Sequence, residues 1–357
     1  MNTEPRTRNH ELGTTNREQR TTNLDALRIA ILGAGEWGKN HVRVFCELLG
    51  PDRVVVCDTD PDRRADAERA HPGVSTCATP DFASIDAAVV ATPVSTHFSI
   101  ARELLSHDVH VLVEKPMTLE TGQARTLIET AERGHRILMV DHLLEYHPAI
   151  VRFKELIEQG DLGHIYYVTS RRLNLGVIRT DENALWSLAP HDISVILYLL
   201  GQEPNSISAQ GATFLQDGIP DVACLTMEFE DGTFAHIHVS WLAPVKTRSL
   251  TLVGEHAMAV YDDMAASKLV IHDKRAKMEG GRYVPQLGNV KAVAIDANEP
   301  LQAVAEAFLK SIRTGKGPRT DGHDGLRVVR VLEAAQLSLK TRKIVELSSD
   351  LRKGKKL

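Results

Sequence analysis

The sequence has few of the features that mark secreted and membrane proteins. Four cysteines, without Cys-x-x-Cys or zinc spacing, cannot form a disulfide framework in 357 residues. No apolar run approaches the roughly 18 residues that span a membrane. Residues 1–23 are polar and lack the apolar segment of a secretory signal, so we expect a disordered leader there. We therefore expect a cytoplasmic protein without a membrane partner.

Neither sign of charge dominates the sequence. It holds 42 Lys and Arg against 47 Asp and Glu, a net charge of −5 that argues against nucleic acid as the main partner. The 16 histidines could suggest a metal, but His236-x-His238 falls in a predicted strand with no carboxylate pair nearby. We predict no metal site.

A glycine-rich turn near the start of the chain carries the strongest signal. The apolar residues 27–32 lead into Gly33-x-Gly35-x-x-Gly38, and a helix is predicted over 36–49. Gly33 allows a tight turn, Gly35 lets a pyrophosphate approach the backbone, and Gly38 lets the helix pack on the sheet. The free N–H groups at the helix start attract phosphates. The motif predicts a dinucleotide site.

An acid follows at the distance that this site requires. The strand Val54–Cys57 ends at Asp58, twenty residues beyond the glycine motif. A carboxylate there accepts hydrogen bonds from both ribose hydroxyls and repels a 2′-phosphate. NAD is therefore favoured over NADP, which Arg63 and Arg64 leave open. The alternative is that Asp58 only caps the turn that follows it.

Strands and helices alternate up to about residue 145. Further strands are predicted over 86–92, 109–114 and 136–140, and helices over 95–107 and 119–134, after which a helix over 148–159 leads away. This alternation predicts an α/β, doubly wound parallel sheet.

From about residue 164 the pattern changes to long strands in succession. They are predicted over 165–173, 206–215, 223–229, 234–242 and 248–253, with final helices over 301–314 and 324–340. This predicts a C-terminal α+β domain with an open, largely antiparallel sheet, helices on one face and subunit contacts on the other. The chain then divides into a leader (1–23), a nucleotide-binding domain (24–145), a substrate and oligomerisation domain (146–345), whose last helix could return to the first domain, and a polar tail (346–357).

Several motifs match one known family. Glu114-Lys115-Pro116 and Ala91-Thr92-Pro93, with His97, follow predicted strands, and His191 stands near the middle of the chain. Over 27–342 the sequence resembles the Gfo/Idh/MocA family of sugar and polyol dehydrogenases, which implies a Rossmann domain followed by an α/β domain with an open sheet. The stretches 37–41, 146–149, 171–176 and 189–192 are similar to a subgroup of UDP-N-acetylglucosamine 3-dehydrogenases and related nucleotide-sugar enzymes.

The resemblance implies two catalytic residues, Lys115 and His191. Oxidation of an alcohol needs a base for the hydroxyl proton and a cation near the oxygen. Pro116 biases Lys115 toward an extended geometry at the carboxyl end of a strand. Because Pro190 precedes His191, we expect a helix over 191–200 whose positive end lowers the histidine pKa. The alternatives are a surface lysine and a capping or core histidine.

The predicted substrate contacts depart from the family at one place. Many members have an aspartate four residues before the histidine, where this sequence has Ser187, with an acid at Asp192 instead. Asp192 orients His191 or binds a sugar hydroxyl, or it only favours a helix start. The other predicted substrate residues are Arg172 and Asn174, on one strand face, and Tyr146 and His147, at the domain junction. Strand-edge charges are the alternative for Arg172.

The predicted cofactor contacts cluster around the same loops. Besides the three glycines, Asp58 and Lys115, they are Glu36, Trp37, Thr92, Pro93, His97 and Glu114. Turn and capping chemistry is the alternative for the residues after the strand at 86–92.

Together these features predict an NAD-dependent dehydrogenase that oxidises a secondary hydroxyl, at C3, of a UDP-N-acetylhexosamine or its uronate in amino-sugar biosynthesis. The alternatives are an NADPH-dependent keto-sugar reductase, an inositol or polyol dehydrogenase, and a non-catalytic dinucleotide sensor. The exposed open sheet predicts a homodimer or homotetramer.

Overall fold

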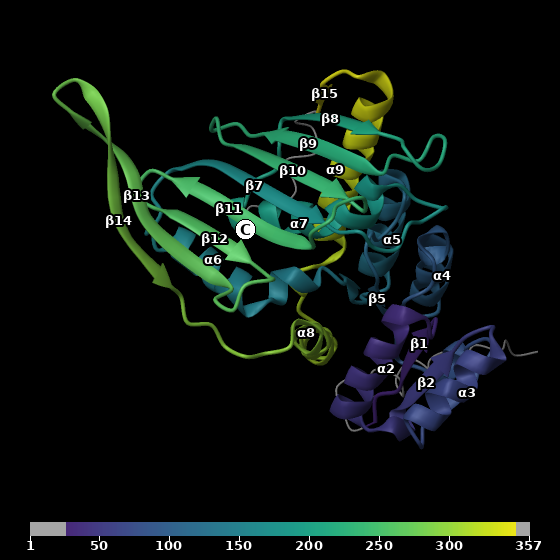
Figure 1. The fold of residues 1–357 in the computed structure, drawn as a ribbon. Helices are drawn as coiled ribbons and strands as arrows, with labels where there is room; N and C mark the ends of the chain where they lie inside the picture. The colour runs from purple at the N-terminus through teal and green to yellow at the C-terminus, as the bar shows by residue number, and fades with distance from the viewer. Residues whose placement is uncertain (1–25, 348–357) are drawn as a thin grey trace, which may run out of the picture. The chain divides into compact units, whose positions relative to one another are not determined.

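The computed structural model describes residues 26–347, which form two compact units (Figure 1). Unit 1 contains the chain up to Asp141 together with Leu301–Leu326, and unit 2 contains His142–Pro300 and the chain from Arg327 onward. The predicted leader and all but the first two residues of the predicted tail lie outside the described residues.

Unit 1 is built on a six-stranded parallel sheet in the order β3-β2-β1-β4-β5-β6. The strands are β1 (Ile29–Leu32), β2 (Val54–Cys57), β3 (Ser75–Cys77), β4 (Ala87–Val90), β5 (His110–Val113) and β6 (Leu138–Val140). The chain reverses its direction across the sheet between β1 and β4, which creates a switch point where such sheets bind ligands. The predicted doubly wound sheet is confirmed.

The helices of unit 1 are α2 (Glu36–Leu49), α3 (Pro61–Ala70), α4 (Val94–Ser106), α5 (Thr121–Arg133) and α8 (Pro300–Thr314), with short 3-10 turns at η1 (Pro51–Arg53) and η2 (Phe82–Ser84). Four of these helices bury one apolar face each, whereas α3 buries only Ala67. In α5 the buried residues Ala124, Leu127, Ile128 and Ala131 are three and four positions apart, so they form one stripe against the sheet core.

A distant segment completes the edge of this sheet. The Val140 N–H donates to the Thr320 carbonyl at 2.8 Å, and the Thr320 hydroxyl donates to the Val140 carbonyl at 2.7 Å. Both groups are buried, so these bonds satisfy backbone atoms at the end of β6. They explain why residues 301–326 belong to unit 1.

Unit 2 is built on a nine-stranded sheet in the order β14-β13-β12-β11-β7-β10-β9-β8-β15. The strands are β7 (Ile165–Leu173), β8 (Ser206–Ala212), β9 (Val222–Glu228), β10 (Phe234–Ser240), β11 (Thr247–Gly254), β12 (Met258–Asp262), β13 (Leu269–Glu279), β14 (Arg282–Ala292) and β15 (Val345–Glu346). The pair β7 and β10 is parallel, and the other neighbours are antiparallel. The predicted open, largely antiparallel sheet is confirmed.

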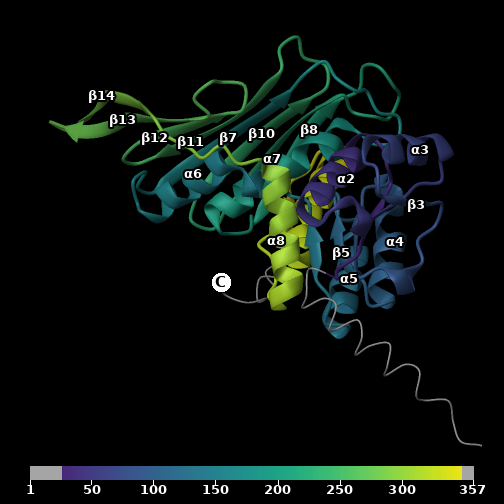
Figure 2. The same cartoon turned by 90° about the horizontal axis from the view of Figure 1, so that it is seen from below.

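Helices cover one face of this sheet. Figure 2 shows α6 (Pro148–Glu158) and α7 (Ala184–Leu200) on the same side of it, and α9 (Gly322–Thr341) contributes to the same core, while η3 (Leu143–Tyr146) leads into α6. Along β10, Ala235, Ile237 and Val239 are buried beneath the helices, whereas His236 and His238 point to the other face and are half-exposed. None of the helices in the described part of the chain is long and apolar enough to cross a membrane.

The hairpin of β13 and β14 was absent from the sequence prediction. Its turn is Gly280-Gly281, with φ of 56° and 79°, and a two-residue turn with both φ positive matches the twist of a hairpin. The signal was readable, but the many charged residues on both sides obscured the alternation of apolar and polar positions. Figure 1 shows this ribbon extending beyond the other strands of the sheet.

Candidate active site

The three glycines of the turn after β1 have different surroundings. Gly33 has φ +92°, and a Cβ on it would lie 2.6 Å from the Ala91 carbonyl oxygen. A Cβ on Gly38 would lie 1.8 Å from the Gly33 carbonyl oxygen, so only glycine lets α2 approach the turn. By contrast, a Cβ on Gly35 would meet nothing nearer than the Arg63 guanidinium at 3.9 Å. Open space therefore lies before the start of α2, which fits a dinucleotide pyrophosphate.

Asp58 is held as a carboxylate beside this turn. Its oxygens accept N–H bonds from Ala34 at 2.8 Å and Asp60 at 2.9 Å, and Arg63 lies 3.6 Å away. Burial opposes ionisation, but these donors and the arginine outweigh it and lower the pKa of Asp58. Each carboxylate oxygen has a second lone pair, so the group can still accept two ribose hydroxyls.

The first turn of α2 places Glu36 and Trp37 next to the glycine turn. Both side chains are exposed, Trp37 by 40% of its surface. An exposed tryptophan beside a site for phosphates is free to contact a ligand. Their predicted contact with the cofactor stays a prediction.

His97 ties together the loops that follow β4 and β5. Its Nδ1 lies 2.9 Å from the Pro116 carbonyl oxygen and its Nε2 lies 2.9 Å from the Thr92 carbonyl oxygen. The ring is buried, which lowers the pKa of His97 even though both carbonyls act in the other direction. The Thr92 hydroxyl pairs with the Thr96 hydroxyl at 2.7 Å. These predicted cofactor residues therefore also hold the loops in place.

Glu114 connects Lys115 to a buried cluster that sequence reasoning missed. One Glu114 oxygen accepts the Lys115 backbone N–H at 3.2 Å, and the other lies 3.0 Å from the His41 Nε2. The same nitrogen of His41 lies 3.4 Å from a carboxylate oxygen of Asp141. The side chains of His41, Glu114 and Asp141 form this cluster, and all three are buried. The Lys115 side chain itself is half-exposed. The cluster fixes the start of the Glu-Lys-Pro loop.

The cluster is charged at neutral pH. Burial alone disfavours an imidazolium, but hydrogen bonds and attraction from Asp141 and Glu114 raise the pKa of His41 to about 9. Burial alone would raise the pKa of Glu114, but its hydrogen bond to His41 and the attraction of the charged imidazole outweigh this effect, so the pKa of Glu114 is lowered.

We expect the stability of the protein to fall as His41 loses its proton. Its pKa of about 9 exceeds the usual 6.5, so its contribution is complete below pH 6.5 and is lost as the pH rises to about 9. The difference corresponds to about 3 kcal/mol. Urea unfolding on either side of this range should show the decrease in the wild type and a smaller one in His41→Gln. His256→Gln, at an exposed histidine, should behave as the wild type. An undiminished decrease in His41→Gln would contradict the prediction.

In unit 2, the predicted start of the helix that carries His191 is wrong. α7 begins at Ala184, and the side chain of Asn183 caps it by accepting the Trp186 N–H at 3.2 Å. Pro190 lies inside the helix, and His191 lies about two turns from its start. The charge of a helix end falls off within the first turn, so the effect expected on this imidazole does not apply. The His191 side chain is half-exposed.

Arg172 and Asp192 are buried against each other. The Arg172 Nε donates to one Asp192 oxygen at 2.7 Å and its Nη2 donates to the other at 3.2 Å, while the Ser170 hydroxyl donates to Asp192 at 2.7 Å. Burial opposes the charge of the guanidinium, yet Asp192 outweighs it and raises the pKa of Arg172. The pair joins β7 to α7 next to His191. The Arg172 guanidinium and the Asp192 carboxylate already pair with each other. Their contact with substrate stays a prediction.

The other predicted substrate residues lie elsewhere in unit 2. The His147 Nδ1 accepts the Ala149 N–H at 3.1 Å, so this histidine caps α6, and burial lowers its pKa. Tyr146 ends η3 and is half-buried. Asn174 follows β7, where its backbone bonds with Ser240 and Ala243.

Comparison with known proteins decides the family. Residues 27–142 match the NAD-binding Rossmann fold of the Gfo/Idh/MocA oxidoreductase family, and residues 150–260 match the C-terminal domain of the same family. A solved structure from Magnetospirillum magnetotacticum MS-1 is 30% identical over 86% of this chain and 98% of its own, with a TM-score of 0.74. The chain belongs to the Gfo/Idh/MocA family. It is therefore an NAD-binding oxidoreductase.

Two curated relatives of this Gfo/Idh/MocA protein act on different sugars or polyols. UDP-N-acetylglucosamine 3-dehydrogenase of Acidithiobacillus ferrooxidans is 29% identical over 85% of this chain and 94% of its own, and its solved structure superimposes with a TM-score of 0.77. Myo-inositol 2-dehydrogenase of Thermotoga maritima is 22% identical over 90% of this chain and 98% of its own. Relatives within the family thus differ in the sugar or polyol that they are named for.

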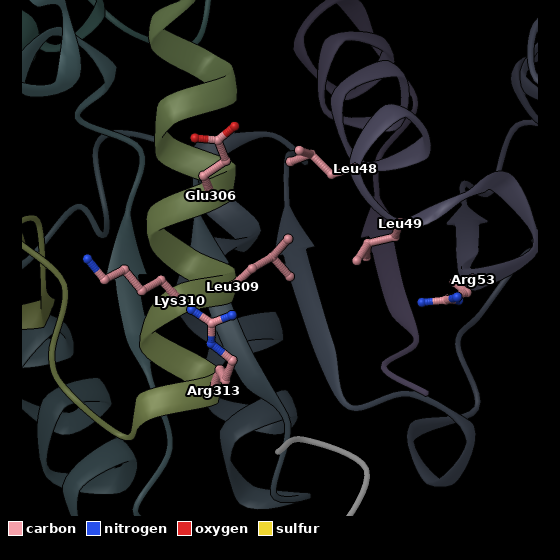
Figure 3. Close-up of a pocket in the computed structure, with 7 residues that line it drawn as sticks. All are labelled: Leu48, Leu49, Arg53, Glu306, Leu309, Lys310 and Arg313. Carbon is pink, nitrogen blue, oxygen red and sulfur yellow. The ribbon is translucent and has the colours of Figure 1, made fainter. Parts of the chain in front are cut away.

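Unit 1 also contains a groove between α2 and α8. Figure 3 shows Leu309 pointing from α8 toward Leu48 and Leu49 at the end of α2, and Arg53 and Arg313 also line it. Arg53 directly precedes β2, which places the groove at the amino ends of the strands. The glycine turn, Asp58 and Lys115 follow the carboxyl ends, so the groove is separate from the cofactor site.

Proposed function

We propose that this family member is an NAD-dependent sugar dehydrogenase that oxidises a secondary hydroxyl, at C3, of a UDP-linked N-acetylhexosamine or its uronate. The product would be a 3-keto sugar, which suits a subsequent transamination in amino-sugar biosynthesis. Lys115 and His191 would be its catalytic residues.

The observation that carries this proposal is the setting of Lys115. It follows the carboxyl end of β5, on the same edge of the sheet as the glycine turn and Asp58. Its backbone is held by Glu114, and its side chain remains accessible. A cation anchored beside a dinucleotide site is suited to stabilise an oxygen that gains negative charge.

The chemistry divides between two side chains. NAD, which the glycine turn and Asp58 would hold, would supply the hydride acceptor for the carbon. Lys115 donates a hydrogen bond to the reacting oxygen, and His191 takes the hydroxyl proton, so the C–H and O–H bonds break and a C=O bond forms. The Arg172 to Asp192 pair holds the helix that carries His191.

The substrate class rests on the comparisons and on the sequence. The relative at 29% identity is named for UDP-N-acetylglucosamine, and the stretches 146–149 and 171–176 support the same subgroup. Inositol oxidation is the second candidate, because the inositol relative covers as much of the chain. Asp58 speaks against an NADPH-dependent reductase, since its carboxylate would repel a 2′-phosphate. A pure sensor would need neither Lys115 nor His191.

The direct test is the absorbance of NADH during incubation of the purified protein with NAD or NADP and a panel of sugars. We expect NADH formation with UDP-N-acetylglucosamine or its uronate, faster with NAD than with NADP. Free sugars and myo-inositol serve as matched alternatives. If NAD were reduced with myo-inositol and with no sugar, the proposed substrate class would be wrong. If the protein bound NAD but reduced it with none of the alcohols, the whole proposal would be overturned.

A further inference from the structure

Two free thiols meet at the carboxyl end of the parallel sheet of unit 1. Cys57 is the last residue of β2 and Cys77 is the last residue of β3, and the two are direct partners in the register of the strands. Their sulfurs lie 2.9 Å apart, and both cysteines are free. Directly paired residues of neighbouring strands share a face of the sheet, so the pairing itself brings the two side chains together.

The backbone at this pair suits a disulfide. Neighbouring strands are about 4.8 Å apart, and the Cα atoms of bridged cysteines are about 4.4–6.8 Å apart. A disulfide bond is about 2.05 Å long, so the sulfurs of Cys57 and Cys77 need to approach each other by only about 0.9 Å. The bond can therefore form without a change in the pairing of β2 and β3.

The two thiols differ in their exposure. Cys77 is half-exposed, so a dissolved oxidant can reach its sulfur, whereas only 4% of the surface of Cys57 is exposed. Burial, followed by the hydrogen bond and the charge of Cys77, raises the pKa of Cys57. Redox-sensitive cysteines combine an accessible sulfur with a second, resolving cysteine close by. Cys77 fits the first role and Cys57 fits the second.

We propose that Cys57 and Cys77 form a reversible disulfide that weakens the binding of NAD, with a low-molecular-weight disulfide as the oxidant. The Cys77 thiolate, whose proton has passed to water, attacks one sulfur of the oxidant. A mixed disulfide forms, and the other half of the oxidant leaves as a thiolate that takes up a proton from water. The Cys57 sulfur then attacks the Cys77 Sγ, and its proton passes to the second departing thiolate. Two protein thiols are oxidised, and one disulfide is reduced to two thiols.

The pair is joined directly to Asp58, the predicted ribose contact. Asp58 follows Cys57 in the chain, and its backbone N–H donates to the Cys77 carbonyl at 3.2 Å. When the two sulfurs approach each other, the ends of β2 and β3 that hold this carboxylate must adjust. Hydrogen bonds from hydroxyls to oxygen span only about 2.5–3.0 Å, so a small displacement of Asp58 weakens its bonds to the ribose. This step rests on the role of Asp58 in the proposed function, whereas formation of the disulfide does not.

The first measurement is a disulfide map of the full chain after incubation with glutathione disulfide. Trypsin cleaves after arginine, so the bridge should link the peptides 54–63 and 70–102, and dithiothreitol should separate them. The double variant Cys46→Ser with Cys224→Ser is the matched control, because it keeps the pair and should give the same link. Absence of the link from both proteins, or glutathione adducts in its place, would overturn the proposal.

The second measurement is fluorescence titration of the same proteins with NAD. The oxidised wild type and the oxidised control should bind NAD about tenfold more weakly than their reduced forms, as expected when a hydrogen bond to a charged group is weakened. Dithiothreitol should restore the affinity. Cys77→Ser, which keeps Asp58 and loses one sulfur, should bind NAD equally well with and without glutathione disulfide.

The two measurements separate the parts of the proposal. A disulfide that forms and leaves the affinity for NAD unchanged would overturn the effect on the cofactor. Neither measurement contains a sugar, so a wrong substrate class in the proposed function would leave both results as they are.

Discussion

Replacing Lys115 with methionine is expected to lower kcat/KM for sugar oxidation by about 10²–10⁴-fold, the range for a single positioned catalytic group. Methionine keeps much of the length of the side chain but removes the charge and the donor. The loss should appear in kcat, because the cation acts on charge that develops during the reaction. Steady-state kinetics with the substrate found in the NADH assay measures it.

A second measurement on Lys115→Met separates an effect on catalysis from an effect on cofactor binding. Affinity for NAD, followed by fluorescence titration, should fall far less than kcat/KM, since the glycine turn and Asp58 are intact in Lys115→Met and Lys115 is only one of the predicted cofactor contacts. Lys39→Met is the matched control, because Lys39 is an exposed lysine on α2 whose ion pair with Asp66 is 3.9 Å long. If Lys115→Met kept most of its activity, the assignment of the catalytic cation would fail.

Replacing Asp192 with asparagine is expected to cost about 3–5 kcal/mol of unfolding free energy, because it leaves the buried Arg172 guanidinium without its counter-charge. The guanidinium donates twice to this carboxylate, and both side chains are buried. Arg172→Met with Asp192→Leu, which removes both charges, should lose less than Asp192→Asn alone. Urea unfolding of the wild type, Arg172→Met, Asp192→Leu and the double variant Arg172→Met with Asp192→Leu closes the cycle and gives the coupling energy.

The same variants test whether Arg172 contacts substrate. Arg171→Met is the control, since Arg171 is exposed on the opposite face of β7. If Arg172 and Asp192 act only as a structural pair, the single variants should lose much stability, and their kinetics should change only because His191 is displaced. A raised KM with undiminished stability would instead favour a direct contact with substrate, and the pair would then not be the main support of α7.

The parts of the fold that the sequence predicted are those written in local patterns. A Cβ on Gly38 would meet the carbonyl oxygen of Gly33, five residues earlier, and Gly33 has a positive φ, so Gly33-x-Gly35-x-x-Gly38 indicated the first strand, turn and helix together. The five strands expected in unit 2 alternate between buried and exposed positions, as in β10, and such alternation is visible in sequence. The β13 and β14 hairpin escaped because charge on both strands weakened that alternation.

The start of α7 shows how one local signal can mislead. Pro190 suggested a helix start, because proline is favoured in the first turn. The earlier segment Ala184, Leu185 and Trp186 is buried in the core of unit 2, and Asn183 caps it. Burial of this extra apolar segment outweighs the hydrogen bond that Pro190 removes from the helix.

The sequence by itself indicated the class of the protein, its NAD cofactor and the place of Lys115 after a strand, because the glycine motif and the alternation of strands and helices are local patterns. Only the tertiary structure decided which buried charged side chains pair with each other. His41 meets Glu114 across 73 positions in the chain, and Arg172 meets Asp192 across 20. A buried charge takes whichever opposite charge the fold brings near it, and that choice depends on packing between distant elements rather than on any pattern along the chain.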